Sequence, residues 1–579
     1  MDNREIASVL HEIAVFSELA GENPFKARAF ASVARIVEKH GESVEELARR
    51  DALSEIPGIG KSIAEAVKGI VIEGRSELLE KLKSGFPATI TDLLSLSGMG
   101  PKRVKTVYEK LDISTVGELE YACRENRLST LPGFGEKLQA NVLRSIEFRK
   151  TTQESRLYSE AKPIGDELLG LADGTGLFSK MDIAGSLRRG KAVFKDIDIL
   201  LVPKKEGDIE AIKKFLLSLA DGGPSDGGVI GAGDTKVSIR RKGLQTDFRI
   251  VPAASYPAAL QHFTGSKEHN TALRTRAKSM GLKMSEYGVF KGDAAIPLKD
   301  EADVYSKIGL PWIPPEIREA DGEMEAAEKG GLPALVASED FRGMIHVHSN
   351  ASDGMHTVKE LAVECKKRGY SYLCLSDHSR TASYAGGLSI EALTSQAEEV
   401  KALNKGLAPF RIFHGIESDI LADGGLDYPE DVLAGLDFVI GSVHSKLTMD
   451  KAAATERLLA AIANPFMTIL GHPSGRLLLS RQGYSYDEDR IFSALAASGV
   501  VLEHNSNPHR LDPDWDVLKR AARRGIMISI NTDAHDFEGF DDMRYGIVMA
   551  RKAWLEKKSV LNCMSVEEID AYFAGRKKR

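Results

Sequence analysis

The spacing of apolar residues changes along the chain, and each pattern predicts a different kind of secondary structure. In the first 84 residues, apolar positions such as Ile6, Leu10 and Ile13 recur at intervals of three and four, which predicts short helices. Residues 85–150 continue this helical pattern, with glycine-rich turns between the helices. From about residue 181 the pattern changes to β-branched runs such as MDIAGSL, DIDILLV, TKVSIRR and TDFRIV, which predict strands broken by glycine or basic turns.

The last part of the chain alternates apolar strands with helices. Strand-like runs such as MIHVH, YLCLSD, FVIGSVH and MISINTD are separated by helix-periodic segments, for example 357–369 and 452–463. This βα alternation predicts a barrel of parallel strands, and such barrels place their functional residues at the carboxyl ends of the strands. The stretch 316–340 that precedes the barrel is acidic and rich in alanine, which is typical of a linker between lobes.

Composition sets broad limits on what the chain can be. Its 579 residues predict three to five domains, and its 42% apolar and 28% charged residues are ordinary for a globular protein. No apolar run approaches the length of a membrane span and the N-terminus lacks a signal-peptide pattern, so we expect a cytoplasmic protein without membrane partners. The net charge of −7 does not exclude nucleic acid, because phosphate affinity depends on local basic patches such as 102–110 and 236–242.

Three segments in the helical region share a G-h-G turn that opens a helix, where h is an apolar residue. Such glycines let the backbone approach a phosphate, and the helix N-terminus offers free N–H groups. One copy could be a plain turn between helices, but three copies with the same flanks favour phosphate binding. The turns resemble helix-hairpin-helix elements, which bind the nucleic-acid backbone without reading bases. We therefore predict DNA contacts at six glycines: Gly58, Gly60, Gly98, Gly100, Gly133 and Gly135.

Carboxylates in the first strand region predict a second kind of phosphate chemistry. Asp196 and Asp198 lie on one face of a strand, and Asp247 lies on the strand that follows a turn at Lys242-Gly243. Three converging carboxylates suit Mg²⁺ with a triphosphate, and two such ions can activate an attacking hydroxyl and neutralise a leaving pyrophosphate. A D-x-D alone is more often a solvated strand edge. The preceding Gly185-Ser186-Leu187-Arg188-Arg189-Gly190 strengthens the case, because Ser186 and Arg189 are placed to hold phosphates.

The ordered set G-S-x-R-R-G, D-I-D and T-D-F resembles the nucleotidyltransferase palm, and the family X DNA polymerases (polymerase beta-like) in particular. The resemblance covers residues 1 to about 318 and extends to Phe263-Thr264-Gly265-Ser266. It implies Mg²⁺ or Mn²⁺ held by Asp196 and Asp198, with Asp247 helping to activate the primer hydroxyl. It also implies nucleotide contacts at Gly185, Ser186, Arg189, Phe263, Gly265, Asn270 and Arg274, of which Asn270 reaches the base edge and Arg274 touches the template.

Two positions depart from that family's pattern. His262 stands where the family commonly has a tyrosine that excludes a ribose 2′-hydroxyl, so we expect easier ribonucleotide insertion. Ala66 stands where relatives with deoxyribose-phosphate lyase activity have a Schiff-base lysine. We therefore expect no lyase reaction through that position, with Lys61 or Lys68 as the substitutes if one occurs.

Histidines and acids at strand-like spacing dominate the last 239 residues. Because residues i and i+2 of a strand face the same side, each H-x-H or D-x-H presents two ligands to one spot. The set resembles the PHP (polymerase and histidinol phosphatase) family from 341 to about 570, which implies a distorted seven-stranded barrel with up to three metals. Mixed imidazole and carboxylate ligation favours Zn²⁺, Mn²⁺ or Fe²⁺. The predicted ligands are His346, His348, Asp353, His378, Glu417, His444, His472, Asp533 and His535.

These patterns and resemblances together predict a multidomain α/β chain: helical helix-hairpin-helix domains, a nucleotidyltransferase α+β palm with a thumb, and a C-terminal distorted (β/α)7 PHP barrel. The expected boundaries are an N-terminal lyase-like helical domain at 1–84, fingers with two helix-hairpin-helix motifs at 85–150, palm at 151–252, thumb at 253–318, linker at 319–340 and PHP domain at 341–579.

The combined interpretation is a bacterial family X DNA polymerase with a C-terminal PHP domain that fills short gaps in DNA repair. We expect gapped or primed DNA and dNTPs as partners, and a monomeric chain. The PHP lobe would act as a 3′–5′ exonuclease and also as an abasic-site (AP) endonuclease. Two alternatives stay open: a phosphoesterase for small molecules with a vestigial polymerase lobe, and a non-catalytic DNA-binding scaffold.

Overall fold

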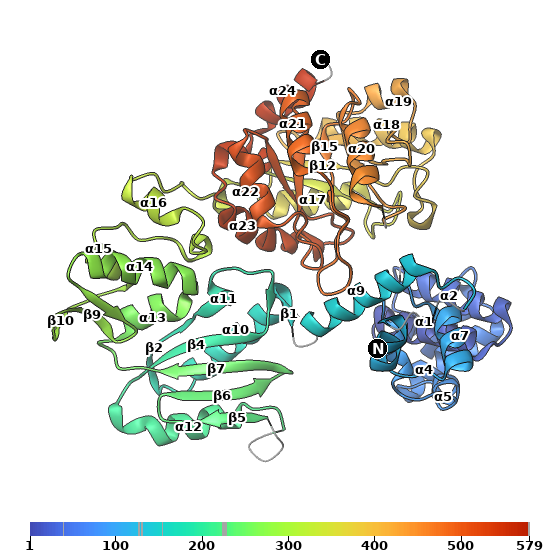
Figure 1. Cartoon of the computed structure of the whole chain (residues 1–579). Coiled ribbons are helices and arrows are strands. Elements are labelled where there is room, and N and C mark those ends of the chain that lie inside the picture. The colour runs from blue at the N-terminus through green and yellow to red at the C-terminus, as the bar shows by residue number, and fades with distance from the viewer. Residues whose placement is uncertain are drawn as a thin grey trace. The chain divides into compact units, whose positions relative to one another are not determined.

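The computed structural model describes residues 1–38, 40–124, 128, 131–152, 155–222, 228–447 and 449–576, so residues 577–579 of the expected PHP domain lie outside the described part. The chain divides into two compact units, residues 1–153 and residues 154–579, whose elements are labelled in Figure 1. Among the described helices, none combines the length and apolar character needed to cross a membrane.

The first unit is helical. Its α-helices are α1 (Asn3–Ala20), α2 (Pro24–Glu38), α3 (Val44–Arg49), α4 (Lys61–Glu73), α5 (Glu77–Lys83), α6 (Ile90–Leu94), α7 (Pro101–Leu111), α8 (Val116–Arg124) and α9 (Glu136–Thr152). Helix α1 begins with a capping box between Asp2 and Glu5 and ends at Gly21 in the left-handed conformation. The apolar faces of the helices share one core that runs from Ile6 to Ile146.

A five-stranded sheet forms the palm of the second unit. Its strand order is β2 (Phe178–Ile183), β4 (Asp196–Pro203), β7 (Leu244–Ile250), β6 (Lys236–Arg241) and β5 (Val229–Ala232). Strands β4 and β7 are parallel and the other pairs are antiparallel. The hairpin between β6 and β7 turns at Lys242 and Gly243, both with positive φ, as the sequence predicts.

Alternate residues of β4 face different partners. Ile197, Ile199 and Leu201 pack with α10 (Tyr158–Asp173) and α12 (Ile209–Ser218). Leu200 and Val202 pack with α13 (Tyr256–Thr264) on the opposite face. One expected strand is shorter than the run MDIAGSL, because β2 ends at Ile183 and the short helix α11 (Gly185–Arg188) begins immediately after it.

The thumb follows the palm. Its elements are α13, α14 (Lys267–Ser279), the antiparallel strands β8 (Lys283–Ser285), β9 (Gly288–Lys291) and β10 (Ala294–Ile296), and α15 (Glu301–Ser306). A two-stranded pair, β1 (Arg156–Leu157) with β3 (Val193–Phe194), lies at the start of the unit. The expected linker is folded: it contains α16 (Glu323–Glu328), and the carboxylate of the fully buried Glu323 lies 2.7 Å from His269 Nδ1.

Seven parallel strands in chain order form the C-terminal barrel (Figure 1). They are β11 (Gly343–Val347), β12 (Tyr372–Leu375), β13 (Arg411–Asp419), β14 (Phe438–Ser442), β15 (Ile469–Leu470), β16 (Val501–Asn505) and β17 (Ile528–Asn531). A bridge between Val347 and Ala534 joins the first strand to the segment after the last. The α-helices are α17 (Val358–Lys367), α18 (Ile390–Leu407), α19 (Glu430–Gly435), α20 (Lys451–Ile462), α21 (Glu488–Ser498), α22 (Trp515–Arg523), α23 (Met543–Lys552) and α24 (Val566–Arg576).

Two apolar layers stabilise the barrel. Outward residues of the strands pack against the surrounding helices, whereas alternate residues such as Cys374 and Ile440 form a separate cluster with α24. Phe573 of α24 is 2% exposed, and its ring centroid lies 5.5 Å from that of Phe413 and 5.3 Å from that of Phe438. Helix α24 therefore closes the inner cluster of the barrel.

Phe573→Ala should destabilise the barrel by about 3–5 kcal/mol, because it leaves a cavity among aromatic rings that cannot collapse fully. Urea unfolding of the whole chain, with hydrogen exchange of β13 and β14 read separately, would measure the loss. Val363→Ala on α17, where the side chain is 52% exposed, serves as the control and should change stability by less than about 0.5 kcal/mol. Equal protection of β13 and β14 in Phe573→Ala and wild type would contradict the role of α24.

Candidate active sites

Strand register brings the three predicted palm carboxylates together. In the parallel pairing of β4 with β7, Asp198 lies directly beside Asp247, and Asp196 lies two residues earlier on the same face. Asp196 is exposed, whereas Asp247 is 6% exposed. The acids therefore form one patch that opens to solvent at Asp196.

Burial, together with repulsion within this patch, raises the pKa values of two of the acids. Burial, followed by the charges of Asp196 and Asp247, raises the pKa of Asp198 to about 6. Burial and Asp247 also raise the pKa of Asp196. Carboxylates that are held close despite this cost are the hard oxygen ligands that Mg²⁺ and Mn²⁺ prefer, so the patch fits divalent cations.

Lys236 on β6 relieves part of the repulsion, and the sequence interpretation missed it. Its Nζ lies 2.7 Å from Asp247 Oδ2, and Gln245 Nε2 donates to Asp247 Oδ1 at 3.1 Å. Burial acts to raise the pKa of Asp247, but hydrogen bonds from Lys236, Ser238 and Gln245 bring it below its ordinary value. The available signal was the alternation of the basic run 236–242, which places Lys236 and Ser238 on one face of a strand.

Gly185 is required by the closeness of the backbone to Asp198. Its φ is +60°, and a Cβ atom there would lie 2.2 Å from Asp198 Oδ2. The neighbouring Ala184 N–H donates to the Asp198 carbonyl at 2.8 Å. The predicted phosphate-binding Ser186 follows, half-buried in α11.

The two arginines of the same loop are held by the thumb segment. Arg189 is 8% exposed; its Nε donates to Glu319 at 3.0 Å and its Nη1 donates to the Thr264 carbonyl. Arg188 forms a two-pronged pair with Glu301 at 2.7 and 2.8 Å. Both guanidinium groups are therefore fixed in direction.

The remaining predicted nucleotide-binding residues gather where α13 meets α14. The Asn270 amide accepts from Gln261 at 2.8 Å and donates to the His262 carbonyl at 2.7 Å. Arg274 Nε donates to the Asn270 carbonyl at 3.3 Å. Phe263 lies under the Arg249 guanidinium, 4.9 Å from the ring centroid, and Gly265 has φ +72°. Burial lowers the pKa of His262, which favours its neutral form.

The three glycine turns of the first unit share one geometry. In each turn the first glycine has positive φ, with values of +94° at Gly58, +87° at Gly98 and +83° at Gly133. The apolar residue between the glycines is buried in all three, and its N–H donates to the carbonyl three residues earlier. Gly60 and Gly100 are exposed N-caps of α4 and α7, so their helices present free N–H groups to solvent. The third turn differs, because Glu136 follows Gly135.

All nine predicted ligands of the barrel lie together around Glu417. Its carboxylate lies 2.9 Å from His378 Nδ1, 3.0 Å from His472 Nε2 and 3.3 Å from His444 Nε2. Among the described residues, these ligands form three groups, and within each group the ligand atoms lie within 4.8 Å of one another. The groups are His348, Asp353, His378 and His535; His346, His348, Glu417 and Asp533; and His378, Glu417 and His444.

Strand alternation alone does not produce this convergence. The register of β11 with β12 shifts at His346, which has φ +64°, and Asp533 beyond β17 has φ +55°. Left-handed backbone is costly for residues other than glycine, so these two ligands are aimed by a bulge and a loop. The residues expected on one face of the strands do converge, but at His346 and Asp533 a bulge and a loop bring them together, not regular strand alternation.

Buried carboxylates outside the predicted set orient the ligands. Glu503 on β16 lies 2.7 Å from His346 Nδ1 and also accepts from the His472 N–H at 3.1 Å. Asp419 lies 2.5 Å from His444 Nδ1. Acids within apolar strand runs, VVLEHN and GIESD, were the signals that could have identified them. Asp377, in contrast, accepts from Ser349 and Gln396 and fixes a loop.

The donor set fits divalent cations. His348 Nδ1 and His472 Nδ1 are buried and form no hydrogen bond to any residue that the structure describes. Burial opposes ionisation of Glu417, but the surrounding histidines hold the pKa of its carboxyl well below its usual range. Buried polar atoms without partners are rare in folded proteins, and a bound cation would satisfy them.

Three of the four other histidines in residues 341–579, namely His414, His504 and His509, have different environments. His414 Nε2 lies 3.0 Å from Gln396, and His504 Nδ1 lies 2.9 Å from the Pro513 carbonyl. Burial lowers the pKa of His414 to about 4 and that of His504 to about 3. His509 is exposed.

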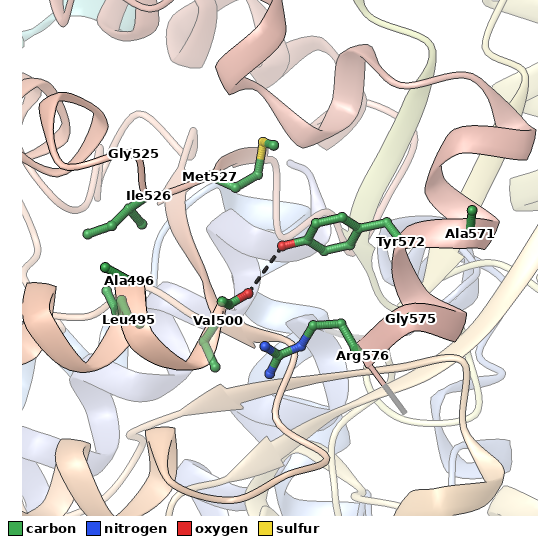
Figure 2. Close-up of a pocket in the computed structure, with 11 residues that line it drawn as sticks. Leu495, Ala496, Val500, Gly525, Ile526, Met527, Ala571, Tyr572, Gly575 and Arg576 are labelled. Carbon is green, nitrogen blue, oxygen red and sulfur yellow. Dashed lines mark hydrogen bonds between the residues drawn. The ribbon is translucent and has the colours of Figure 1, made fainter. Parts of the chain in front are cut away.

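A cavity of about 370 Å³ lies away from both sites (Figure 2). It is lined by Gly499 and Gly525, which precede β16 and β17, and by Tyr572 and Arg576 of α24. Tyr572 donates to the Gly499 carbonyl at 3.2 Å. The cavity is therefore at the amino ends of the strands, whereas the metal ligands lie at their carboxyl ends.

Four families match separate parts of the chain. Residues 1–76 match the helix-hairpin-helix domain, and residues 90–147 match the SAM-like helix-hairpin-helix tandem. Residues 259–319 match the DNA polymerase beta thumb, and residues 345–507 match the PHP domain. The polymerase beta and PHP families imply a dependence on divalent metals.

Relatives align with the whole chain or with one of its portions. DNA polymerase lambda from Arabidopsis thaliana is 24% identical over 55% of this chain and 62% of its own length. A protein named "probable phosphatase" from Caldanaerobacter subterraneus is 27% identical over 40% of this chain and 91% of its own. The DNA polymerase/3′-5′ exonuclease PolX of Bacillus subtilis is 37% identical over 99% of both chains. The chain therefore belongs to the PolX family, the family X DNA polymerases that carry a C-terminal PHP domain.

Proposed function

We propose that the chain is a DNA polymerase that fills short gaps in DNA repair and carries a 3′–5′ exonuclease in its PHP portion. One observation carries the proposal: two complete ligand sets converge within residues 154–579, three carboxylates on the palm sheet and nine imidazole and carboxylate ligands at the barrel. The Bacillus subtilis relative is named for both activities. The partners would be gapped or primed DNA and dNTPs, with the chain acting as a monomer.

In the palm, each residue group has one task. Mg²⁺ or Mn²⁺ would supply the positive charge that activates the primer hydroxyl and neutralises pyrophosphate. Asp196 and Asp198 would hold the ions, and Asp247, kept ionised by Lys236, would help to activate the primer 3′-hydroxyl. Ser186 and Arg189 would contact the phosphates of the nucleotide. Phe263 to Gly265 would contact its sugar and base, Asn270 the base edge and Arg274 the template.

In the PHP portion, buried carboxylates that lie against the predicted metal ligands would hold those ligands in place. Zn²⁺, Mn²⁺ or Fe²⁺, up to three ions, would supply an activated water and charge neutralisation for phosphodiester hydrolysis. Glu417 would contribute ligand atoms to more than one ion, because its two oxygens face different histidines. Glu503 and Asp419 would fix the rings of His346 and His444. The same groups would serve cleavage at an abasic site.

The phosphatase alternative is the less favoured one. Relatives named probable phosphatases align with only about 40% of this chain or less. A vestigial polymerase lobe would not need to retain three adjacent acids against their mutual repulsion, and here all three are present. The scaffold alternative is weaker still, because buried unpartnered ligand atoms serve no purpose in DNA binding alone.

Separate variants should remove the two activities one at a time. With gapped primer–template DNA, Asp198→Ala should abolish extension and leave degradation intact, whereas His346→Ala should do the reverse. Denaturing gels with and without dNTPs would measure both activities. Asp234→Ala and His509→Ala, at exposed positions in the same portions, are the matched controls. Extension that survives Asp198→Ala would remove the polymerase proposal.

Metal content should follow the barrel ligands. His378 belongs to two of the three ligand groups, so His378→Ala should lower the bound metal per chain after dialysis against excess Mn²⁺ or Zn²⁺. Elemental analysis by mass spectrometry gives this readout without an activity assay. Asp198→Ala and His509→Ala should retain the barrel metals. A metal content unchanged by His378→Ala would contradict the proposed ligand set.

The helix-hairpin-helix turns should contribute unequally to DNA affinity. Gly100→Asp places a negative charge at a free helix N-terminus, so it should weaken binding to gapped DNA and reduce the salt slope by about one. Gly135→Asp should have a smaller effect, because Glu136 already occupies that helix start. Gly117→Asp in α8 adds the same charge at an exposed glycine and should change little. Fluorescence anisotropy at several salt concentrations measures this order, and equal effects of all three variants would refute it.

A further inference from the structure

The phosphate-binding loop of the palm is packed directly on a helix of the PHP portion. Gly190, which ends the loop, has φ +65°, and a Cβ atom there would lie 2.3 Å from Val548 Cγ1 on α23. Tyr545 and Met549 of the same helix join the apolar cluster that contains Leu187. The loop that carries Ser186 and Arg189 therefore rests on α23.

Lys552, at the end of α23, contacts Arg189 directly at its carbonyl and indirectly through Glu319. Its side chain is 1% exposed, and its Nζ donates to the Arg189 carbonyl at 3.1 Å and to the Glu316 carbonyl at 3.3 Å. The same Nζ lies 2.5 Å from Glu319 Oε1. That oxygen also accepts from Arg189 Nε at 3.0 Å. One carboxylate oxygen is therefore shared between the arginine of the palm and the lysine of the PHP portion.

The acidic segment after the thumb, residues 316–321, also pairs with basic side chains of the PHP portion that do not contact Arg189. Lys519 on α22 is 2% exposed and pairs with Asp321 at 2.6 Å, with its Nζ over the Trp554 ring. Arg551 pairs with Glu316 at 2.7 Å. Lys519 is therefore a second buried lysine that pairs with the same acidic segment, and no contact joins it to the phosphate-binding loop in the described part of the chain.

Charge balance gives Lys552 a specific task. Arg189 with Glu319 alone would be a neutral pair, whereas the group of Arg189, Glu319 and Lys552 carries one positive charge in a site with little water. We propose that Lys552 is a positioning residue of the nucleotidyl-transfer site. By offsetting the negative charge of Glu319, it leaves the positive charge of the fixed Arg189 guanidinium available to the phosphates of an incoming nucleotide. This inference rests on the proposed polymerase function, and it makes nucleotide binding by the palm depend on the PHP portion.

Steady-state gap filling with the full chain tests the proposal at saturating DNA and varied dNTP. Lys552→Met should raise the KM for dNTP about tenfold, the effect of losing one charge-assisted interaction, with a smaller change in kcat. Lys552→Arg should keep the KM near the wild-type value. Degradation of DNA without dNTPs should be unchanged in each variant, because Lys552 lies outside the metal ligands. Lys519→Met is the matched control and should leave the KM unchanged.

A charge-restoring double variant separates this role from simple docking. Glu319→Gln combined with Lys552→Met leaves the arginine as the single charge and avoids a buried unpaired carboxylate, so it should fold and return the KM to within about twofold of wild type. The proposal would be overturned if the KM of the double variant were as high as that of Lys552→Met. It would also be overturned if Lys519→Met and Lys552→Met changed the KM equally. If Lys552→Met fails to fold, the KM of the double variant is compared with that of wild type. A KM well above the wild-type value would then overturn the proposal. Wild-type enzyme that does not extend primers would instead refute the polymerase function itself.

Discussion

The parallel register between β4 and β7 places Asp198 beside Asp247, and much of the palm is arranged around the repulsion between them. Two negative charges in a partly buried position destabilise a fold unless cations or donors compensate them. Lys236 compensates one side of the patch and solvent reaches the other at Asp196. Gly185 lets the backbone of the next loop come close to the same carboxylate. A strand slipped by one residue would point these acids into the apolar face packed by α10 and α12.

The barrel meets the same electrostatic problem with different chemistry. Its central acid, Glu417, is fully buried, but the surrounding histidines hold the pKa of its carboxyl well below its usual range, which a second and third carboxylate could not do. Glu503 and Asp419 each lie against one imidazole and set the direction of its ring. The palm offers partly exposed carboxylate oxygens, which are hard ligands, whereas the barrel offers buried imidazole nitrogens, which are softer. The two sites should therefore prefer different ions within one chain.

Short-range spacing predicted the elements and the places where the candidate site residues gather, because both depend largely on local geometry. The palm acids, the glycine turns and the barrel ligands follow from D-x-D, G-h-G and H-x-H patterns. The structure brings the acids together and the barrel ligands together, and it gives the three turns one backbone geometry. The missed residues depend on packing between distant segments. Lys236 meets Asp247 only through a hairpin register, and Lys552 meets Glu319 across 233 positions of sequence. The acidic stretch after the thumb has the composition of a solvated linker, yet Glu319 and Asp321 pair with lysines that no local pattern connects to them.

The left-handed backbone at His346 and Asp533 has a consequence for how the barrel holds its ions. Each such residue stores about 1–3 kcal/mol of conformational strain. The surrounding fold holds both residues in this conformation, so the strain lowers the stability of the barrel and is not a cost of binding a cation. Both ligands are therefore aimed before a cation arrives, and relaxing either residue would spoil that aim while it stabilised the barrel.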